Sequence, residues 1–186
     1  MSAPGDLAAL VAMRLTHDLA GPLGAVATAI DLLDGGDPEI RALVADGAAA
    51  AVASLRLHRF VLAPGDDGSP ANGLLGAWIA TRDGVTLDWR AAPADAAIVV
   101  GLAMTAAEAA RPGATLVVDG STVTVTPAPE LDAHVIAALA GHAATIPRAS
   151  LAGILHARAA ERGGAISVTT NGGVLRLAYQ GSALPR

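Results

Sequence analysis

Two long stretches of helical periodicity, joined by one short break, constrain the fold of this chain more than any other feature of its sequence. In residues 5–34, core-type positions recur at steps of four, three, four, four and three, so they fall along one side of an α-helix. They are Leu15, Leu19, Pro22, Val26, Ile30 and Leu33. Residues 38–62 carry a second such stripe, made of Ile40, Leu43, Val44, Gly47, Ala51, Leu55, His58 and Leu62. The break between them is Asp34-Gly35-Gly36-Asp37-Pro38, where glycine suits a helix end, aspartate an N-cap and proline a first helical position.

Two long helices joined by a short loop predict a helical hairpin over residues 1–63. A lone hairpin buries only part of its apolar stripes, whereas two hairpins together form a four-helix bundle. The composition favours the same arrangement, because 53% of the residues are hydrophobic but only 2% are aromatic. Alanine dominates, and it buries little area per residue. We therefore expect a homodimer with a central four-helix bundle.

The remaining chain predicts a second, mixed domain. Residues 64–72 lack periodicity, open with Pro-Gly-Asp-Asp-Gly-Ser-Pro and are predicted to be a linker. Residues 73–186 carry both strand and helix signals. We expect strands at 85–89, 115–118, 123–125, 166–170 and 174–179, and helices at 94–110, 131–140 and 150–161. Turns at Asp119-Gly120 and Asn171-Gly172 predict β-hairpins, so the whole chain is expected to be α+β, its second domain an α/β sandwich with helices on one face of the sheet.

The net charge of -5 at pH 7 and the lack of cysteine narrow the function. An acidic chain without a basic patch is not expected to bind nucleic acid. Without cysteine there are no disulfides or thiolate metal sites, which fits a reducing compartment. Residues 1–6 do not read as a signal peptide, and no apolar run approaches the roughly 20 residues that span a bilayer. We expect a cytoplasmic protein that does not contact membranes.

His17 is the candidate reactive residue. It lies two positions from both Leu15 and Leu19, about 200° round the helix from each, so it is predicted to face solvent. The same face carries Arg14, Gly21, Gly24, Thr28 and Asp31. Each glycine costs roughly 1 kcal/mol relative to alanine in a helix, a cost that makes sense if a partner approaches the backbone beside the histidine. We expect Arg14, Gly21, Gly24 and Thr28 to form a partner-docking surface.

A solvent-facing imidazole can accept a phosphoryl group, since a neutral ring nitrogen is a nucleophile near neutral pH. Asp18 can orient the ring or accept the proton of its other nitrogen. Arg14, one turn earlier, can attract a phosphoryl group or an acidic partner pocket. Pro22 predicts a kink beyond the histidine.

The stretch His17-Asp18-Leu19-Ala20-Gly21-Pro22-Leu23 resembles the H-box of sensor histidine kinases, which reads His, an acidic residue, three variable positions, Pro and Leu. The match covers His17, Asp18, Pro22 and Leu23, on the first helix of a hairpin. By this resemblance His17 is the phospho-acceptor, while Pro22 and Leu23 are structural.

The C-terminal region resembles the ATP-binding domain of the same kinases in outline, at Gly101–Leu116 and Glu161–Ile166. The residues that hold ATP in those kinases are replaced. Thr105 stands for the metal-binding asparagine, Thr126-Pro127-Ala128-Pro129 for Asp-x-Gly-x-Gly, and Arg148-Ala149-Ser150-Leu151 for the second glycine-rich box. Without that carboxylate and those glycines, little remains to bind adenine or cradle a triphosphate. We expect no cofactor and no ATP use.

A matching H-box hairpin with a degenerate ATP-binding domain resembles the ChpT-type histidine phosphotransferases. The resemblance implies a homodimer whose His17 takes a phosphoryl group from a response-regulator receiver aspartate and passes it to another receiver, which supplies its own Mg²⁺. Gly21 replaces the Thr or Asn that helps related kinases act as phosphatases, so weak phosphatase activity is expected. Two alternatives stay open: a divergent histidine kinase, and a non-catalytic adaptor that docks receivers.

Other residues are given structural interpretations. His58 is interpreted as a packed or capping histidine of the second helix. Trp78 and Trp89 are expected to anchor the core or an interface. His134, His142 and His156 lack ligand spacing, so no metal site is predicted.

Overall fold

The computed structural model describes residues 4–32, 37–63 and 70–181, and within them the chain forms six helices and one five-stranded sheet. The helices are α1 (Pro4–Asp31), α2 (Pro38–Leu62), α3 (Ala71–Ile79), α4 (Ala96–Ala109), α5 (Ala133–Leu139) and α6 (Pro147–Glu161). The strands are β1 (Thr86–Ala91), β2 (Thr115–Asp119), β3 (Thr122–Thr126), β4 (Ala165–Asn171) and β5 (Val174–Gln180). The α+β class predicted from the sequence is confirmed. No helix in this part of the chain is long and apolar enough to cross a membrane.

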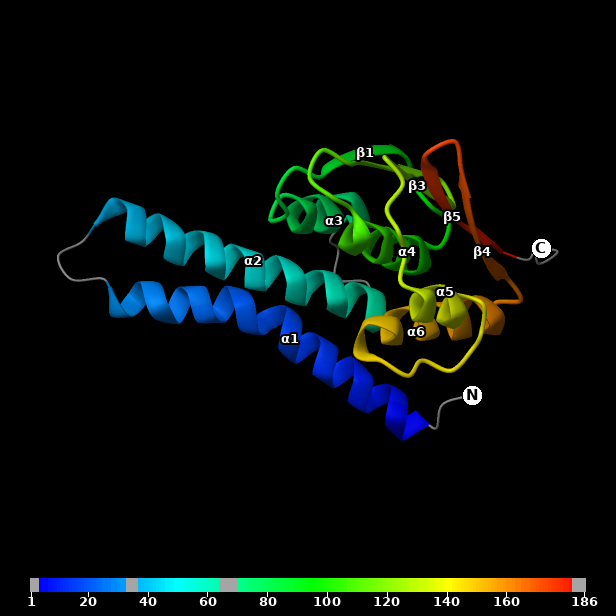
Figure 1. Cartoon of the computed structure of the whole chain (residues 1–186), viewed down its shortest axis with the longest axis horizontal. Coiled ribbons are helices and arrows are strands. Elements are labelled where there is room, and N and C mark those ends of the chain that lie inside the picture. The colour runs from blue at the N-terminus through cyan, green and yellow to red at the C-terminus, as the bar shows by residue number, and fades with distance from the viewer. Residues whose placement is uncertain (1–3, 33–36, 64–69, 182–186) are drawn as a thin grey trace.

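Helices α1 and α2 lie side by side and project from the rest of the molecule, as the predicted hairpin requires (Figure 1). Asp37 caps the N-terminus of α2, as predicted, because its carboxylate accepts a hydrogen bond from the Glu39 amide at 2.9 Å. The preceding break, at residues 34–36, lies outside the described residues. Figure 1 shows that α1 is bent, in keeping with the proline at position 22, which has no amide hydrogen for the Asp18 carbonyl. Gly47 lets the helices approach, because a Cβ there would lie 2.8 Å from Val26 Cγ2.

The hairpin leaves apolar side chains uncovered in a single copy of the chain. Ile30, Leu43 and Leu55 belong to the predicted stripes, yet they are 54%, 50% and 54% exposed. Val52 and Leu23 are similarly exposed, at 47% and 53%. Exposed apolar groups of this size gathered on one hairpin are typical of a surface that another protein covers. The dimeric four-helix bundle stays a prediction.

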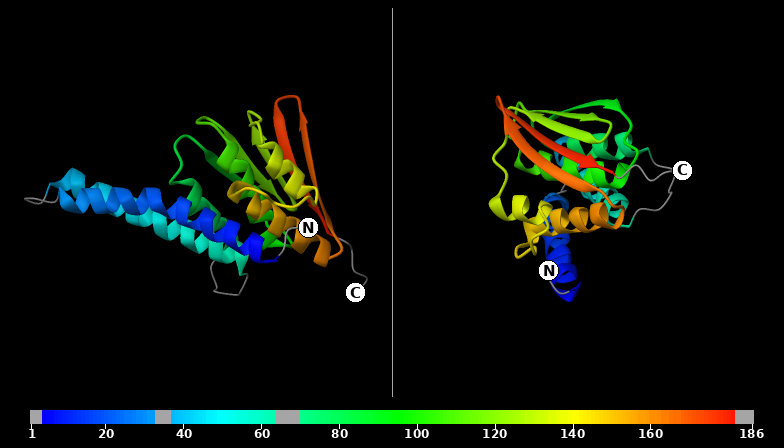
Figure 2. Two further views of the ribbon diagram at one scale, coloured as in Figure 1. Left: turned by 60° about the horizontal axis from the view of Figure 1, so that its bottom comes forward. Right: turned by 90° about the vertical axis from the view of Figure 1, so that its right-hand side faces the viewer.

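The sheet has the strand order β1-β2-β3-β5-β4, with β1 and β2 parallel and every other pair antiparallel. The two predicted hairpins are confirmed, and Gly120 and Gly172 turn them with φ values of 55° and 56°. Helices α3 to α6 cover one face of the sheet, as Figure 2 shows. Helix α4 lies at the centre, and its residues 97–107 are all buried. The predicted two-layer sandwich is therefore present.

Some boundaries differ from those predicted. The last two residues of the segment 64–72 begin α3, a helix that the sequence analysis did not predict. Helix α3 is short, and its sequence has no charged residue beside the buried Leu74, Leu75, Trp78 and Ile79. The sequence therefore lacks the alternation of apolar and polar faces by which a helix is predicted. Helix α6 begins at Pro147, three residues early, because proline suits the first turn. Trp78 is a core residue, with 4% exposure, whereas Trp89 is only partly buried against the core.

Candidate functional site

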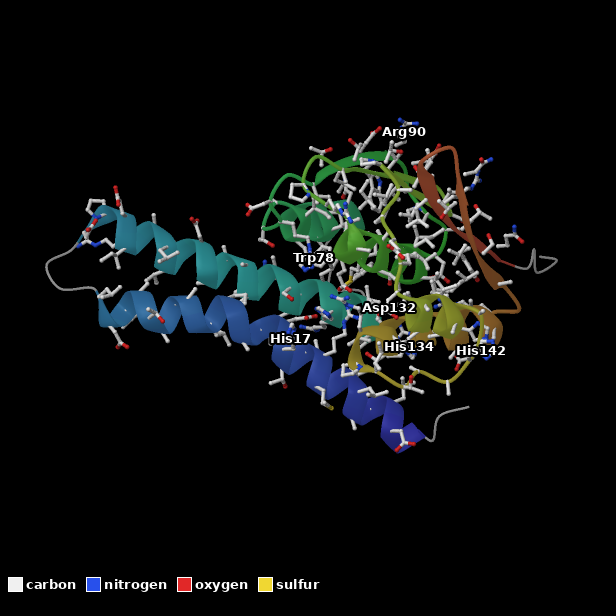
Figure 3. The ribbon with its side chains drawn as sticks, in the orientation of Figure 1. His17, Trp78, Arg90, Asp132, His134 and His142 are labelled. Atoms are coloured by element: carbon white, nitrogen blue, oxygen red, sulfur yellow. The ribbon has the colours of Figure 1, made fainter. Side chains whose placement is uncertain are left out.

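His17 lies on the surface of α1, and its side chain is 90% exposed, which confirms the predicted orientation (Figure 3). Its Nδ1 lies 3.4 Å from Oδ1 of Asp18, a long contact for a hydrogen bond. The ring's Nε2 has no partner among the described residues. One nitrogen therefore faces a carboxylate, and the other is open to a partner molecule.

Asp18 lies behind the exposed histidine and meets two cationic or ionisable groups. Its Oδ2 is 3.5 Å from Arg14 Nε and 3.5 Å from His58 Nε2. Burial alone would raise the pKa of Asp18, but the nearby imidazoles of His58 and His17 and the charge of Arg14 together hold that pKa below its usual value. The carboxylate is therefore kept ionised beside the imidazole of His17.

His58 supports Asp18 from α2. The side chain is 3% exposed, so the interpretation of His58 as a packed histidine is confirmed. Its Nδ1 lies 2.9 Å from the Ser54 carbonyl oxygen, an acceptor, so this nitrogen carries the hydrogen and donates it. The opposite nitrogen then faces Asp18. His58 Nε2 lies 3.5 Å from Asp18 Oδ2 without forming a hydrogen bond, and the sequence analysis missed this proximity.

Arg14 does not lie on the exposed face, which corrects the expectation drawn from helical periodicity. Its side chain is 7% exposed and forms an ion pair with Glu108 of α4. The same guanidinium donates a hydrogen bond to the Arg148 carbonyl at 2.8 Å, in α6. The N-terminal half of α1 packs on α6, so this part of its face is covered. Arg14 thus links the α1–α2 hairpin to α4 and α6 of the second domain, directly beside His17 and Asp18.

The other residues of the predicted docking surface are exposed. A Cβ added at Gly21 or Gly24 would meet no atom within 4 Å, and Thr28 is exposed as well. Leu23 is 53% exposed, while Pro22 is partly buried. Beyond His17, α1 therefore offers an open surface of small residues. The docking role of these residues stays a prediction.

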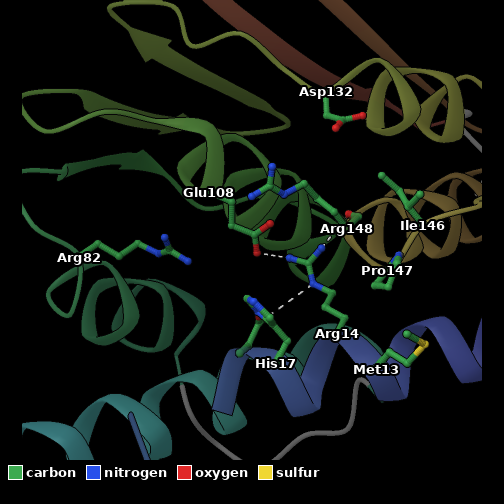
Figure 4. Close-up of a pocket in the computed structure, with 10 residues that line it drawn as sticks. Met13, Arg14, His17, Arg82, Glu108, Asp132, Ile146, Pro147 and Arg148 are labelled. Carbon is green, nitrogen blue, oxygen red and sulfur yellow. Dashed lines mark hydrogen bonds and ion pairs between the residues drawn. The ribbon is translucent and has the colours of Figure 1, made fainter. Parts of the chain in front are cut away.

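Two cavities meet at His17. The larger has a volume of about 590 Å³ and lies between α1 and the second region (Figure 4). Its walls are formed by Met13, Arg14, His17, Asp18, Arg82, Glu108, Asp132, Ile146, Pro147 and Arg148. The second, of about 320 Å³, lies between α1, α2 and α3. His17, Asp18 and Arg82 line both, so Arg82 joins the site although nothing in the local sequence marks it.

A third cavity, of about 220 Å³, lies beside α4 and α5, where the resemblance to kinases would place ATP. Glu108, Glu130, Asp132 and Arg148 line it, so carboxylates outnumber cations there, which disfavours the binding of a triphosphate. The hydroxyl of Thr105 is occupied, since it donates to the Gly101 carbonyl at 2.9 Å. The described residues contain no cluster of three or more His, Cys, Asp or Glu side chains that could hold a metal ion. The absence of a cofactor stays a prediction.

Comparison with known proteins identifies the fold. No protein-family model matches the sequence, and no curated protein matches it. A solved structure of a bacterial phosphotransferase superposes with a TM-score of 0.81 and 19% sequence identity, over 97% of this chain and 98% of the other. A histidine kinase from Burkholderia phymatum STM815 gives a TM-score of only 0.37, with 19% identity over 96% of this chain and 98% of that one. This chain therefore has the fold of the bacterial phosphotransferase.

Proposed function

We propose that this protein is a histidine phosphotransferase of a two-component phosphorelay, of the ChpT type. His17 accepts a phosphoryl group from the aspartate of one receiver domain and passes it to the aspartate of another. The observation that carries the proposal is the 90% exposed imidazole of His17, which lies beside Asp18 at the rim of a cavity lined by arginines. The H-box resemblance and the fold similarity support it.

The geometry suits nucleophilic attack by Nε2. In the tautomer whose Nδ1 carries the hydrogen and faces Asp18, the lone pair of the ring lies on Nε2, which is open to solvent. That lone pair forms the N–P bond with the acyl phosphate of a receiver. The P–O bond to the aspartate breaks, and its electron pair leaves with the carboxylate. No proton has to leave the ring, which becomes a phosphorylated imidazolium, and the Asp18 carboxylate offsets the positive charge.

The same arrangement allows the reverse step. The carboxylate of a second receiver attacks phosphorus, the N–P bond breaks, and its electrons return to Nε2 as a lone pair. Asp18 thus orients the ring and stabilises its charge in both directions. Each receiver supplies its own Mg²⁺, and this chain needs no cofactor.

The partner surface proposed for a receiver is the open face of α1 at Gly21, Gly24 and Thr28, where the backbone is accessible.

The exposed apolar groups of the hairpin support a homodimer, in which two hairpins form a four-helix bundle. Residues 1–63 would then be the dimerisation and phosphotransfer domain, and the degenerate ATPase-like domain would begin with α3 at Ala71 rather than at residue 73. We place the protein in the cytoplasm.

Intact-mass spectrometry after incubation with phosphorylated receivers tests the proposal. The native protein, His17→Ala and His142→Ala are compared, with Mg-ATP alone as a further arm; His142 is also exposed but lies in the loop after α5. Acid-labile phosphate on the native protein and His142→Ala, but not on His17→Ala or from ATP, is expected. Phosphate gained from ATP alone would favour a divergent kinase. No phosphate from a broad receiver panel would favour a non-catalytic adaptor.

A further inference from the structure

Arg82 is held rigidly next to the site by residues of its own segment. It follows α3, and its amide donates to the Ile79 carbonyl at 2.9 Å. Its guanidinium stacks on the indole of Trp78, with Cζ 3.9 Å from the ring centroid. Trp78 is only 4% exposed, so the surface on which Arg82 rests is fixed in the core. The orientation of Arg82 therefore does not depend on a charged partner.

Arg82 forms no direct ion pair among the described residues. No carboxylate there lies within 4.0 Å of it, and its Nε is buried without a hydrogen-bond partner. Burial lowers the pKa of Arg82, and the charges of Glu108 and Asp18 offset that effect only in part. A partly desolvated cation without a direct ion-pair partner is costly, and an anion bound beside it would lower that cost.

The other two arginines of the larger cavity differ from Arg82. Arg14 already has ion pairs with Glu108 and Asp18. Arg148 is exposed and also borders the third cavity. Of these three arginines, only Arg82 lines both cavities that meet at His17, and Figure 4 shows its guanidinium pointing across the larger one toward the histidine.

We propose that Arg82 binds the phosphoryl oxygens while the group is carried by His17 or is being transferred to or from it. This inference rests on the proposed function and assigns a phosphate-binding residue from outside the hairpin. A guanidinium donates two parallel N–H groups to two non-bridging oxygens, and it does so without giving up a proton. Arg82 therefore takes no part in the bonds that form and break, and it offsets the charge of the phosphoryl group.

The test uses Arg82→Gln and Arg82→Lys, with Arg90→Gln as the matched control. Arg90 is an exposed arginine on β1 that pairs with Asp88, outside the cavities. Each variant is phosphorylated with a phosphorylated receiver and, separately, with phosphoramidate, which needs no docking surface. We expect Arg82→Gln to be slower by roughly 10- to 100-fold with both donors, as for the loss of a charged hydrogen bond. The phosphorylation rate of Arg82→Lys should lie between those of the native protein and Arg82→Gln, and the rate of Arg90→Gln should equal the native rate.

A ³¹P NMR titration of the phosphohistidine separates phosphate binding from a structural effect. A neighbouring guanidinium favours the dianion, so the midpoint of the phosphoryl titration should rise in Arg82→Gln and stay unchanged in Arg90→Gln. Native rates and an unchanged midpoint in Arg82→Gln would overturn the inference. A defect with the receiver alone would overturn it too, because Arg82 would then contact the receiver. If Arg82→Gln does not fold, as judged by circular dichroism, native rates and midpoint in Arg82→Lys would count against a specific guanidinium contact. Failure of the native protein to gain phosphate from any donor would instead refute the proposed function.

Discussion

Replacing Arg14 with methionine is expected to lower the free energy of unfolding by about 3 kcal/mol. Methionine keeps an apolar stem but leaves Glu108 without its partner in a largely covered position, with Arg14 7% and Glu108 17% exposed. Removing one partner of a buried ion pair costs about 3–5 kcal/mol, and the residual exposure of Glu108 favours the lower end. In a chain of this size the melting temperature should fall by about 6–12 °C.

Urea unfolding at one fixed protein concentration measures this effect, since an oligomer's stability depends on concentration. The control is Arg90→Met, which breaks an ion pair whose side chains are 59% and 44% exposed and should cost about 0–1 kcal/mol. The double variant Arg14→Met with Glu108→Leu should recover most of the lost stability, because it leaves no buried charge unpaired. If Arg14→Met lowered the free energy of unfolding no more than Arg90→Met does, the Arg14–Glu108 ion pair between α1 and α4 would not stabilise the fold.

Three further predictions concern pH, packing and assembly. The pKa of Asp18 is lower in the folded than in the unfolded state, so ionised Asp18 contributes to the free energy of unfolding above the unfolded pKa, and this contribution is lost as pH falls from about 5 through the folded pKa. Asp18→Asn should therefore make the free energy of unfolding, measured with urea, fall less steeply at acid pH. The same steepness in Asp18→Asn and the native protein would contradict this. A Cβ at Gly101 would lie 2.4 Å from Leu155 Cδ2, so Gly101→Val should destabilise by about 1–3 kcal/mol in thermal unfolding, and a stabilised variant would show that the crossing of α4 and α6 is loose. Light scattering should find the native protein dimeric and Leu43→Glu with Leu55→Glu monomeric, whereas a native monomer at all concentrations would rule out the bundle.

The hairpin and the exposure of His17 could be predicted because both follow from local periodicity. A stripe with helical spacing fixes which side of α1 is apolar, and the histidine two positions from Leu15 and Leu19 must then face outward. The two β-hairpins were equally accessible, because Asp-Gly and Asn-Gly turns are local signals. The contact of His58 with Asp18 could not be predicted in this way, because antiparallel pairing about a break near residue 35 places a position about six residues before His58 opposite Asp18.

The burial of Arg14 and the presence of Glu108 and Arg82 at the site could not be predicted in this way. They depend on how α1 packs against α4 and α6, and this packing brings together residues far apart in the chain. Periodicity assigns a residue to a side of its helix, but it does not say whether a second helix covers that side. Residue 14 lies on the same face as residue 17, yet only the first is covered.

The exposure of His17 also bears on how long a phosphoryl signal would persist. An imidazole that is 90% accessible has little protein around it to exclude water from a group attached there. The lifetime of the phosphorylated state would then be set mainly by the intrinsic stability of the N–P bond and by how soon an acceptor arrives. Under the proposed function, the protein would pass the phosphoryl group on rather than retain it, and the phosphorylated fraction would depend on the concentration of acceptor receivers.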